Sequence, residues 1–224
     1  MFKKLLEFLR KPPLMKEAEE IVLEMLHISY DMFQYSMSVV IEKEKEKEDI
    51  YKIDQKLNQL QIKVRKNVLE HLAINPAQDI IPSLILTTIV IDIERIGDFS
   101  KNLIELSHKY PKPLRGKYIE EIKVLEGKVQ TNFKKLIDVF KDQNQKLGSR
   151  IMEELVLVSK ECHSMLEELV EDENLNPKEG IIYALLIRYL KRVSVHIKNV
   201  ASSVVNPFHR LGYKPGEESG EEKG

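Results

Sequence analysis

The sequence predicts an all-α protein made of two tandem, pseudo-symmetric three-helix bundles with six long antiparallel helices. Apolar residues recur at three- and four-residue steps through most of the chain, which is the period of an amphipathic helix. The 224 residues include only 9 glycines and 9 prolines, and these stand at a few discrete breaks. The same order of helices and proline-marked breaks occurs twice, which indicates an internal duplication.

The first bundle is predicted over residues 14–110. It follows an N-terminal segment, residues 1–13, for which we predict a short amphipathic helix docked on the body, or alternatively one in weak contact with a membrane surface. The charged run at 42–49 predicts a solvated turn and the start of the second helix. Asn75 and Pro76 predict the end of that helix. The third helix is predicted to start either at Pro76, with Asn75 as its N-cap, or nearer Asp79, because Pro82 is tolerated only in the first turn, and to end at about His108.

The second bundle is predicted over residues 117–209, after a linker marked by proline and glycine. We expect helices at 118–140, 151–170 and 181–205, with a polar connection at 141–147 that closes on Gly148. Asn176-Pro177 repeats the earlier Asn-Pro break. Residues 210–224 are rich in Gly, Glu and Ser towards their end, and a disordered tail is predicted there.

Composition excludes several classes of function. The 35 Lys and Arg nearly balance 36 Asp and Glu, so the net charge is -1 and no broad basic face for nucleic acid is predicted. Cys162 is the only cysteine, which excludes an intramolecular disulfide and favours a reducing, cytoplasmic location. The longest mostly apolar run, residues 80–91, is too short to span a bilayer.

Acidic residues at helical spacing form the main candidate site. Glu94 and Asp98 lie one turn apart on one helix face, and Asp54 and Asn58 repeat that spacing on the preceding helix. Helical bundles build metal sites from carboxylates on facing helices. A set rich in oxygen ligands suits iron, manganese, magnesium or calcium. The alternative is that all four side chains are solvated surface residues.

Two features favour the site over the solvated surface. Gly97 costs a helix about 1 kcal/mol relative to alanine, so a glycine here indicates close approach of a neighbouring element. Glu94 and Asp98 also follow a segment that is apolar nearly all round, where charges need partners or a metal. Arg95 is the competing partner, and it would satisfy these carboxylates without a metal.

The stretch Glu94-Arg95-Ile96-Gly97-Asp98, followed by Asn102, resembles the signature of the PhoU family of phosphate uptake regulators. The spacing of Asp54 and Asn58 is similar to that family's second-helix pattern, and the resemblance covers the chain from Leu14 to His209. It implies that iron or another divalent or trivalent metal binds Asp54, Glu94 and Asp98. Asn58, Arg95 and Asn102 would then support these ligands.

The second half departs from the family pattern. Lys191 stands where the acidic residue should be, and Val195 stands where the Asp should be. Ser159 and His163 align with Asp54 and Asn58. Because Lys191 would repel a cation, we expect no comparable metal site in this bundle.

The resemblance also implies a function. It implies a non-enzymatic regulator of phosphate uptake and phosphate-starvation signalling that binds the phosphate ABC transporter, through its ATPase subunit, or the sensor histidine kinase. Such partners would bring the protein close to the membrane, and a homodimer is favoured. Two alternatives stay open, a metal-dependent enzyme built on a carboxylate bundle and a regulator of a different ion transporter.

Overall fold

The computed structural model describes residues 13–213, which form six long helices and no strand. The long helices are α2 (Pro13–Met37), α3 (Ile50–Ile74), α4 (Ile80–Lys109), α5 (Lys117–Asp142), α6 (Gln145–Glu171) and α7 (Pro177–Val205). A π-helix (Ser38–Glu42) extends α2, and a short 3-10 helix (Phe208–Arg210) follows α7. The predicted all-α class and its two three-helix bundles are confirmed.

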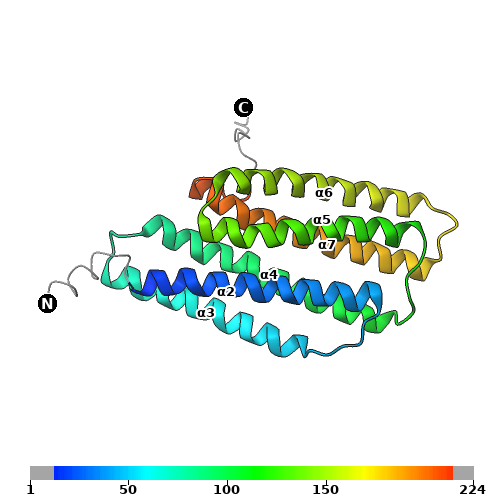
Figure 1. Cartoon of the computed structure of the whole chain (residues 1–224), viewed down its shortest axis with the longest axis horizontal. Coiled ribbons are helices and arrows are strands. Elements are labelled where there is room, and N and C mark those ends of the chain that lie inside the picture. The colour runs from blue at the N-terminus through cyan, green and yellow to red at the C-terminus, as the bar shows by residue number, and fades with distance from the viewer. Residues whose placement is uncertain (1–12, 214–224) are drawn as a thin grey trace, which may run out of the picture.

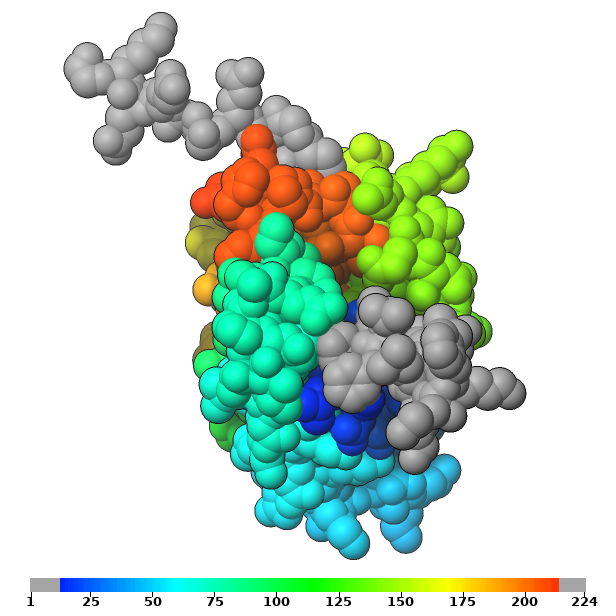
Figure 2. Space-filling view, turned by 90° about the vertical axis from the view of Figure 1, so that its left-hand side faces the viewer, coloured from blue at the N-terminus to red at the C-terminus, as the bar shows by residue number. Residues whose placement is uncertain are grey.

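The two bundles lie against each other along their length (Figure 1). Helices α2, α3 and α4 pack together as the first bundle, and α5, α6 and α7 pack together as the second. Contact between the bundles is made mainly by α4 with α7, and also by α2 with α5. Seen end-on, the orange end of α7 lies directly above the teal start of α4 (Figure 2).

The two Asn-Pro breaks are built differently. Asn176 caps α7, its side chain accepting a hydrogen bond from the backbone N–H of Lys178, and Pro177 is the first helical residue. Asn75 instead ends α3, its own N–H donating to the His71 carbonyl. Of the two predicted starts of the third helix, Pro76 is therefore wrong, and the start near Asp79 agrees with the structure. A turn intervenes and α4 begins at Ile80, preceded by Asp79 at φ 56°.

The connection between α5 and α6 is shorter than predicted. It contains only Gln143 and Asn144, and the Asn144 side chain caps α6 by accepting from the Leu147 N–H. Gly148 lies inside α6, where a Cβ atom would stand 2.8 Å from a Val205 methyl carbon. The prediction that Gly148 closes a connection is wrong because sequence alone does not separate a turn glycine from one that admits a packed neighbour.

Residues 210–213, predicted as the start of a disordered tail, pack back onto the end of α7. The Asn206 side chain donates to the carbonyls of Arg210 and Tyr213, and Lys198 Nζ donates to the Gly212 carbonyl at 2.8 Å. The predicted N-terminal helix up to residue 12 and the rest of the tail lie outside the described residues. Between residues 13 and 213, no helix is long and apolar enough to cross a membrane.

A polar contact joins the bundles within the α4–α7 interface. Asp92 Oδ1 lies 2.7 Å from Nδ1 of His196 and accepts a hydrogen bond from the Asn199 amide at 2.9 Å. The Phe99 ring stacks on His196 with 5.8 Å between centroids. Asp92 lies within the segment that is apolar nearly all round in the sequence, and this segment is not covered on every side because Ile91 is 43% exposed.

Helices α3 and α4 approach each other closely at Gly97, as the glycine predicts. A Cβ atom at this position would lie 2.7 Å from Cδ2 of Leu57 and 3.5 Å from Oδ1 of Asp54. Leu57 is fully buried, so it has little room to move away. Gly97 therefore admits α3, and the Asp54 carboxylate reaches α4 as a consequence.

We expect Gly97→Val to destabilise the protein by about 1–3 kcal/mol through overpacking against Leu57. Gly127→Val is the matched control, because Gly127 is exposed on α5 and a Cβ atom added there would have no heavy atom within 4 Å. The free energy of unfolding in urea measures both. Equal effects of the two substitutions would contradict a packing role for Gly97.

Candidate functional site: an acidic cluster on the first bundle

The three predicted ligand residues come together between α3 and α4. Asp54 projects from α3, and Glu94 and Asp98 project from successive turns of α4. Asp54 is 5% exposed, and the side chains of Glu94 and Asp98 are 17% and 28% exposed. We call these three residues the acidic cluster. They are therefore not solvated surface residues.

Lys101, one turn beyond Asp98, supplies the positive charge at the acidic cluster. Its Nζ atom lies 2.7 Å from Oδ2 of Asp54 and 2.9 Å from Oδ1 of Asp98. The ammonium group thus bridges the two helices. Burial alone would lower the pKa of Lys101, but its hydrogen bonds to Asp54 and Asp98 outweigh burial and raise it.

The predicted supporting residues have different positions. Asn58 donates from its amide to Oδ2 of Asp54 at 3.1 Å. Arg95 is paired with Asp98 at 3.2 Å and stands farther from Glu94, at 4.0 Å. Within the described chain, Asn102 makes no hydrogen bond to the acidic cluster, so the structure brings together Asn58 and Arg95 but not Asn102.

Glu94 is the least compensated member of the acidic cluster. Burial raises the pKa of its carboxyl group, and the neighbouring charge of Asp98 raises it further. Arg95 and Lys101 act in the opposite direction without cancelling the shift. A buried carboxylate beside other carboxylates favours a bound proton or an additional cation.

The donor chemistry of the acidic cluster suits a hard cation, but its present geometry does not form a complete site. Oδ1 of Asp54 is buried and lacks a hydrogen-bond partner, as an oxygen ligand would before metal binds. Lys101, however, stands between Asp54 and Asp98. Within residues 13–213, no three His, Cys, Asp or Glu side chains are arranged to hold a metal ion. Metal binding here would require the Lys101 ammonium to move.

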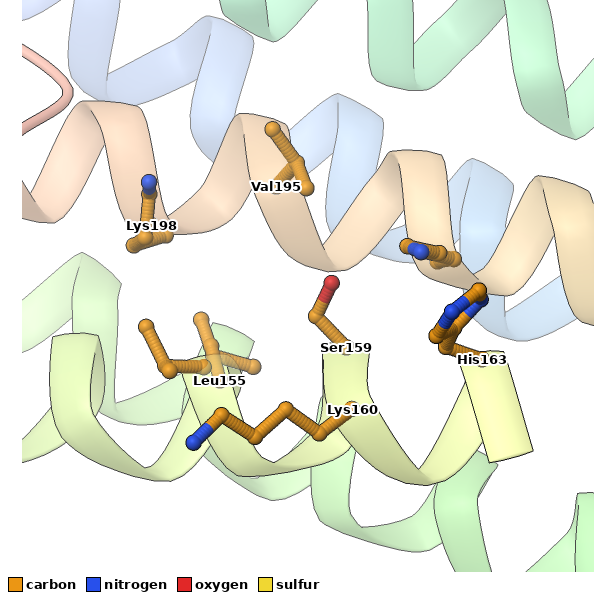
Figure 3. Close-up of a pocket in the computed structure, with 8 residues that line it drawn as sticks. Leu155, Ser159, Lys160, His163, Val195 and Lys198 are labelled. Carbon is orange, nitrogen blue, oxygen red and sulfur yellow. The ribbon is translucent and has the colours of Figure 1, made fainter. Parts of the chain in front are cut away.

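The corresponding position of the second bundle is a basic pocket between α6 and α7 (Figure 3). It has a volume of about 270 Å³. Ser159 and His163 on α6 and Lys191 and Val195 on α7, the four residues aligned with the acidic motif, all line it. The remaining lining residues are Leu155, Val156, Lys160 and Lys198.

Cys162, beside this pocket in sequence, is packed inside the bundle. Its side chain is fully buried, and burial raises the pKa of the thiol to about 12. His163 points elsewhere and lies 3.5 Å from Glu167 on the protein surface. A nucleophilic Cys–His pair is therefore not formed, in agreement with the different directions of adjacent residues on a helix.

Sequence reasoning missed Lys101 as a member of the site. Two signals pointed to it: its spacing of three residues from Asp98 on the same helix face, and the matching Lys198 in the second half. The interbundle contact between Asp92 and His196 was also missed, because nothing in one sequence specifies which residues of two bundles meet.

We expect Lys101→Met to destabilise the protein by about 3 kcal/mol, because it leaves Asp54 buried without a charge partner. In a cycle with Asp54→Asn, the double variant should be more stable than the sum of the single effects predicts. The exposed pair of Lys56 and Glu24, 2.8 Å apart, is the control and should show much weaker coupling. Additive effects of Lys101→Met and Asp54→Asn would exclude the bridging role.

Comparison with known proteins shows which family the chain belongs to. The model of the PhoU domain matches the chain twice, at residues 22–107 and 122–204. No curated protein sequence matches the chain.

Two solved structures share the fold. The phosphate transport system regulatory protein PhoU from Streptococcus pneumoniae has a TM-score of 0.73 and 14% identity, covering 85% of this chain and 92% of its own. PhoU from Pseudomonas aeruginosa has a TM-score of 0.65 and 21% identity, covering 91% of this chain and 97% of its own. One domain match falls in each bundle, and together they span most of the chain, so this protein belongs to the PhoU domain family.

Proposed function

We propose that this protein is a non-enzymatic regulator of phosphate uptake and phosphate-starvation signalling. The observation that carries the proposal is the pair of PhoU domain matches, one in each bundle. The similar protein from Streptococcus pneumoniae is a phosphate transport system regulatory protein, and its fold extends over nearly the whole of this chain. Regulation would act through binding of the phosphate ABC transporter, the sensor histidine kinase, or both.

The geometry gives less support to a metal-dependent enzyme. Ferritin-type di-iron bundles need Glu-x-x-His pairs that project inward from two helices. The chain has this spacing at Glu24 and His27 and at Glu105 and His108. Both histidines are exposed, and His108 is paired with Glu46 of the loop before α3. These pairs do not converge on one core position, which favours a binding role over carboxylate-bundle chemistry.

Deletion of the gene should derepress phosphate-starvation genes in phosphate-rich medium, because a negative regulator would be lost. Reporter expression from a starvation promoter measures the effect. Complementation with the wild-type chain should restore repression, and so should the fold-neutral variant Gly127→Val. Normal repression in the deletion strain would refute the proposal.

Affinity capture from the native cell separates the proposal from the alternative of a different ion transporter. Recovery of the phosphate-transporter ATPase subunit or the sensor kinase supports the phosphate pathway. Recovery of an unrelated ion transporter in their place would favour the alternative. The homodimer stays a prediction.

We further propose that the acidic cluster binds a divalent or trivalent metal, with Asp54, Glu94 and Asp98 as ligands. The unpartnered Oδ1 of Asp54 and the raised pKa of Glu94 support the proposal. A metal would supply the positive charge that Lys101 now provides, and Asn58 would continue to hold Asp54 in place. The role of such a metal would be structural or regulatory.

Elemental analysis of protein purified from its native cell should find bound metal, with iron and manganese as the first candidates. Changing Asp54, Glu94 and Asp98 together to their amides should abolish it, because three charged oxygen ligands are lost. The control changes Asp138, Glu153 and Glu173, exposed acidic residues of the second bundle, in the same way. Metal content that is absent from the wild type, or that survives the first triple change, contradicts the proposal.

A further inference from the structure

We propose that the basic pocket between α6 and α7 binds a phosphoryl oxyanion. Three lysines, Lys160, Lys191 and Lys198, line this hollow together with His163, and no carboxylate is among its lining residues. Like charges gathered around one hollow repel each other, and a bound dianion turns that repulsion into attraction. The inference goes beyond the regulatory function and does not depend on any protein partner.

The pocket occupies the place that the acidic cluster occupies in the first bundle. Lys191 stands at the position of Glu94, and Val195 stands at that of Asp98. Lys198 corresponds to Lys101, so the lysine is common to both halves while the acids are not. The second bundle therefore has a positively charged pocket at the place where the first bundle has a negatively charged cluster. The exchange of Glu for Lys means that the pocket attracts an anion in place of a cation.

The polar groups that line the pocket can donate hydrogen bonds to an anion. The Ser159 hydroxyl points from α6 toward α7, and Lys160 extends along the α6 edge (Figure 3). Lys198 Nζ donates a hydrogen bond to the Gly212 carbonyl at 2.8 Å, so Lys160 and Lys191 are the lysines on which the proposal rests. Ammonium and hydroxyl groups that line one hollow suit the oxygens of a phosphate, which accept charge-assisted hydrogen bonds.

Two carboxylates lie near the pocket, and one is paired outside it while the other is paired with His163 of its lining. Glu161 lies 2.6 Å from Lys128 of α5, and Glu167 lies 3.5 Å from His163 at the outer end of the pocket. Leu155, Val156 and Val195 supply an apolar wall with no acceptor that competes for the lysines. An apolar wall also lowers the local dielectric and strengthens attraction between the lysines and an anion.

The volume of about 270 Å³ accommodates a single phosphate with its water or the terminal phosphoryl group of a larger ester. Both sources share one chemistry, a tetrahedral dianion held by ammonium groups. Free inorganic phosphate and a phosphate ester are therefore distinguished by experiment.

The test is calorimetric titration of the full chain with inorganic phosphate and, separately, with ATP as the ester probe, at constant ionic strength. Loss of the Lys191 ammonium in Lys191→Gln should weaken binding about tenfold or more, because a hydrogen bond to a charged group is removed.

Lys160→Gln, on the exposed α6 edge, is a second variant that keeps the test valid if Lys191→Gln does not fold. Lys134→Gln, which removes an exposed charge from α5 outside the pocket, is the control and should bind like the wild type.

Phosphate binding that is lost in the pocket variants and kept in the control supports the proposal with free phosphate as ligand. Binding of ATP alone, with the same dependence on the lysines, supports it with an ester as ligand. No binding of either probe, or equal loss in Lys134→Gln, overturns it. Because the readout is direct binding, failure here leaves the regulatory function, tested in the deletion strain, untouched.

Discussion

The bridge from Lys101 to Asp54 and Asp98 is the interaction on which the geometry of the first bundle's site depends. Asp54 is buried between α3 and α4, and a carboxylate in that place is costly without a charge partner. Gly97 creates the place, because only a residue without a side chain lets Leu57 and Asp54 lie so close to α4. Lys101 then offsets the cost of burying the Asp54 carboxylate, because its ammonium group forms ion pairs with both Asp54 and Asp98. The close packing of α3 on Gly97 and the pairing of Asp54 with Lys101 therefore depend on each other. A side chain at position 97 would move Asp54 away from Lys101, and loss of Lys101 would leave Asp54 buried without a charge partner.

Much of the fold follows from the sequence because helical periodicity is a local property. Each helix carries its own apolar stripe, and Asn176 with Pro177 marks a helix start in a way that depends only on backbone chemistry. Errors occur where one residue type serves two purposes. Asn75 ends α3 instead of opening α4, and Gly148 admits Val205 instead of forming a turn. The acidic residues of the candidate site were predicted from their spacing along each helix. Lys101 was not predicted, because its contact with Asp54 depends on how closely α3 and α4 pack, which the spacing does not give.

The two halves show how far a duplicated backbone constrains chemistry. Both keep a lysine at the matching turn of their third helix, Lys101 and Lys198, and both keep an asparagine after it, Asn102 and Asn199. The matching residues nevertheless have different contacts. Asn199 donates to Asp92 across the interface between bundles, whereas Asn102 does not contact the acidic cluster. Duplication preserves the helix and its direction, and the tertiary surroundings decide what each side chain touches. The charge reversal between Glu94 and Lys191 is compatible with an unchanged fold for the same reason.

Competition between Lys101 and a metal has a consequence for how any metal affinity is interpreted. A cation entering between Asp54 and Asp98 must displace the ammonium group, so the measured affinity is the difference between two interactions with the same carboxylates. The ion pairs of Lys101 with Asp54 and Asp98 would thus lower the apparent affinity for a metal, although the metal-binding carboxylates stay the same. The raised pKa of Lys101 means that deprotonation offers no easy route of release, so the side chain must swing into solvent while still charged. Its partial exposure, 20% of the side chain, leaves a path for that movement. Lys101, which pairs with the buried carboxylates in this structure, would therefore also set the threshold for any metal binding.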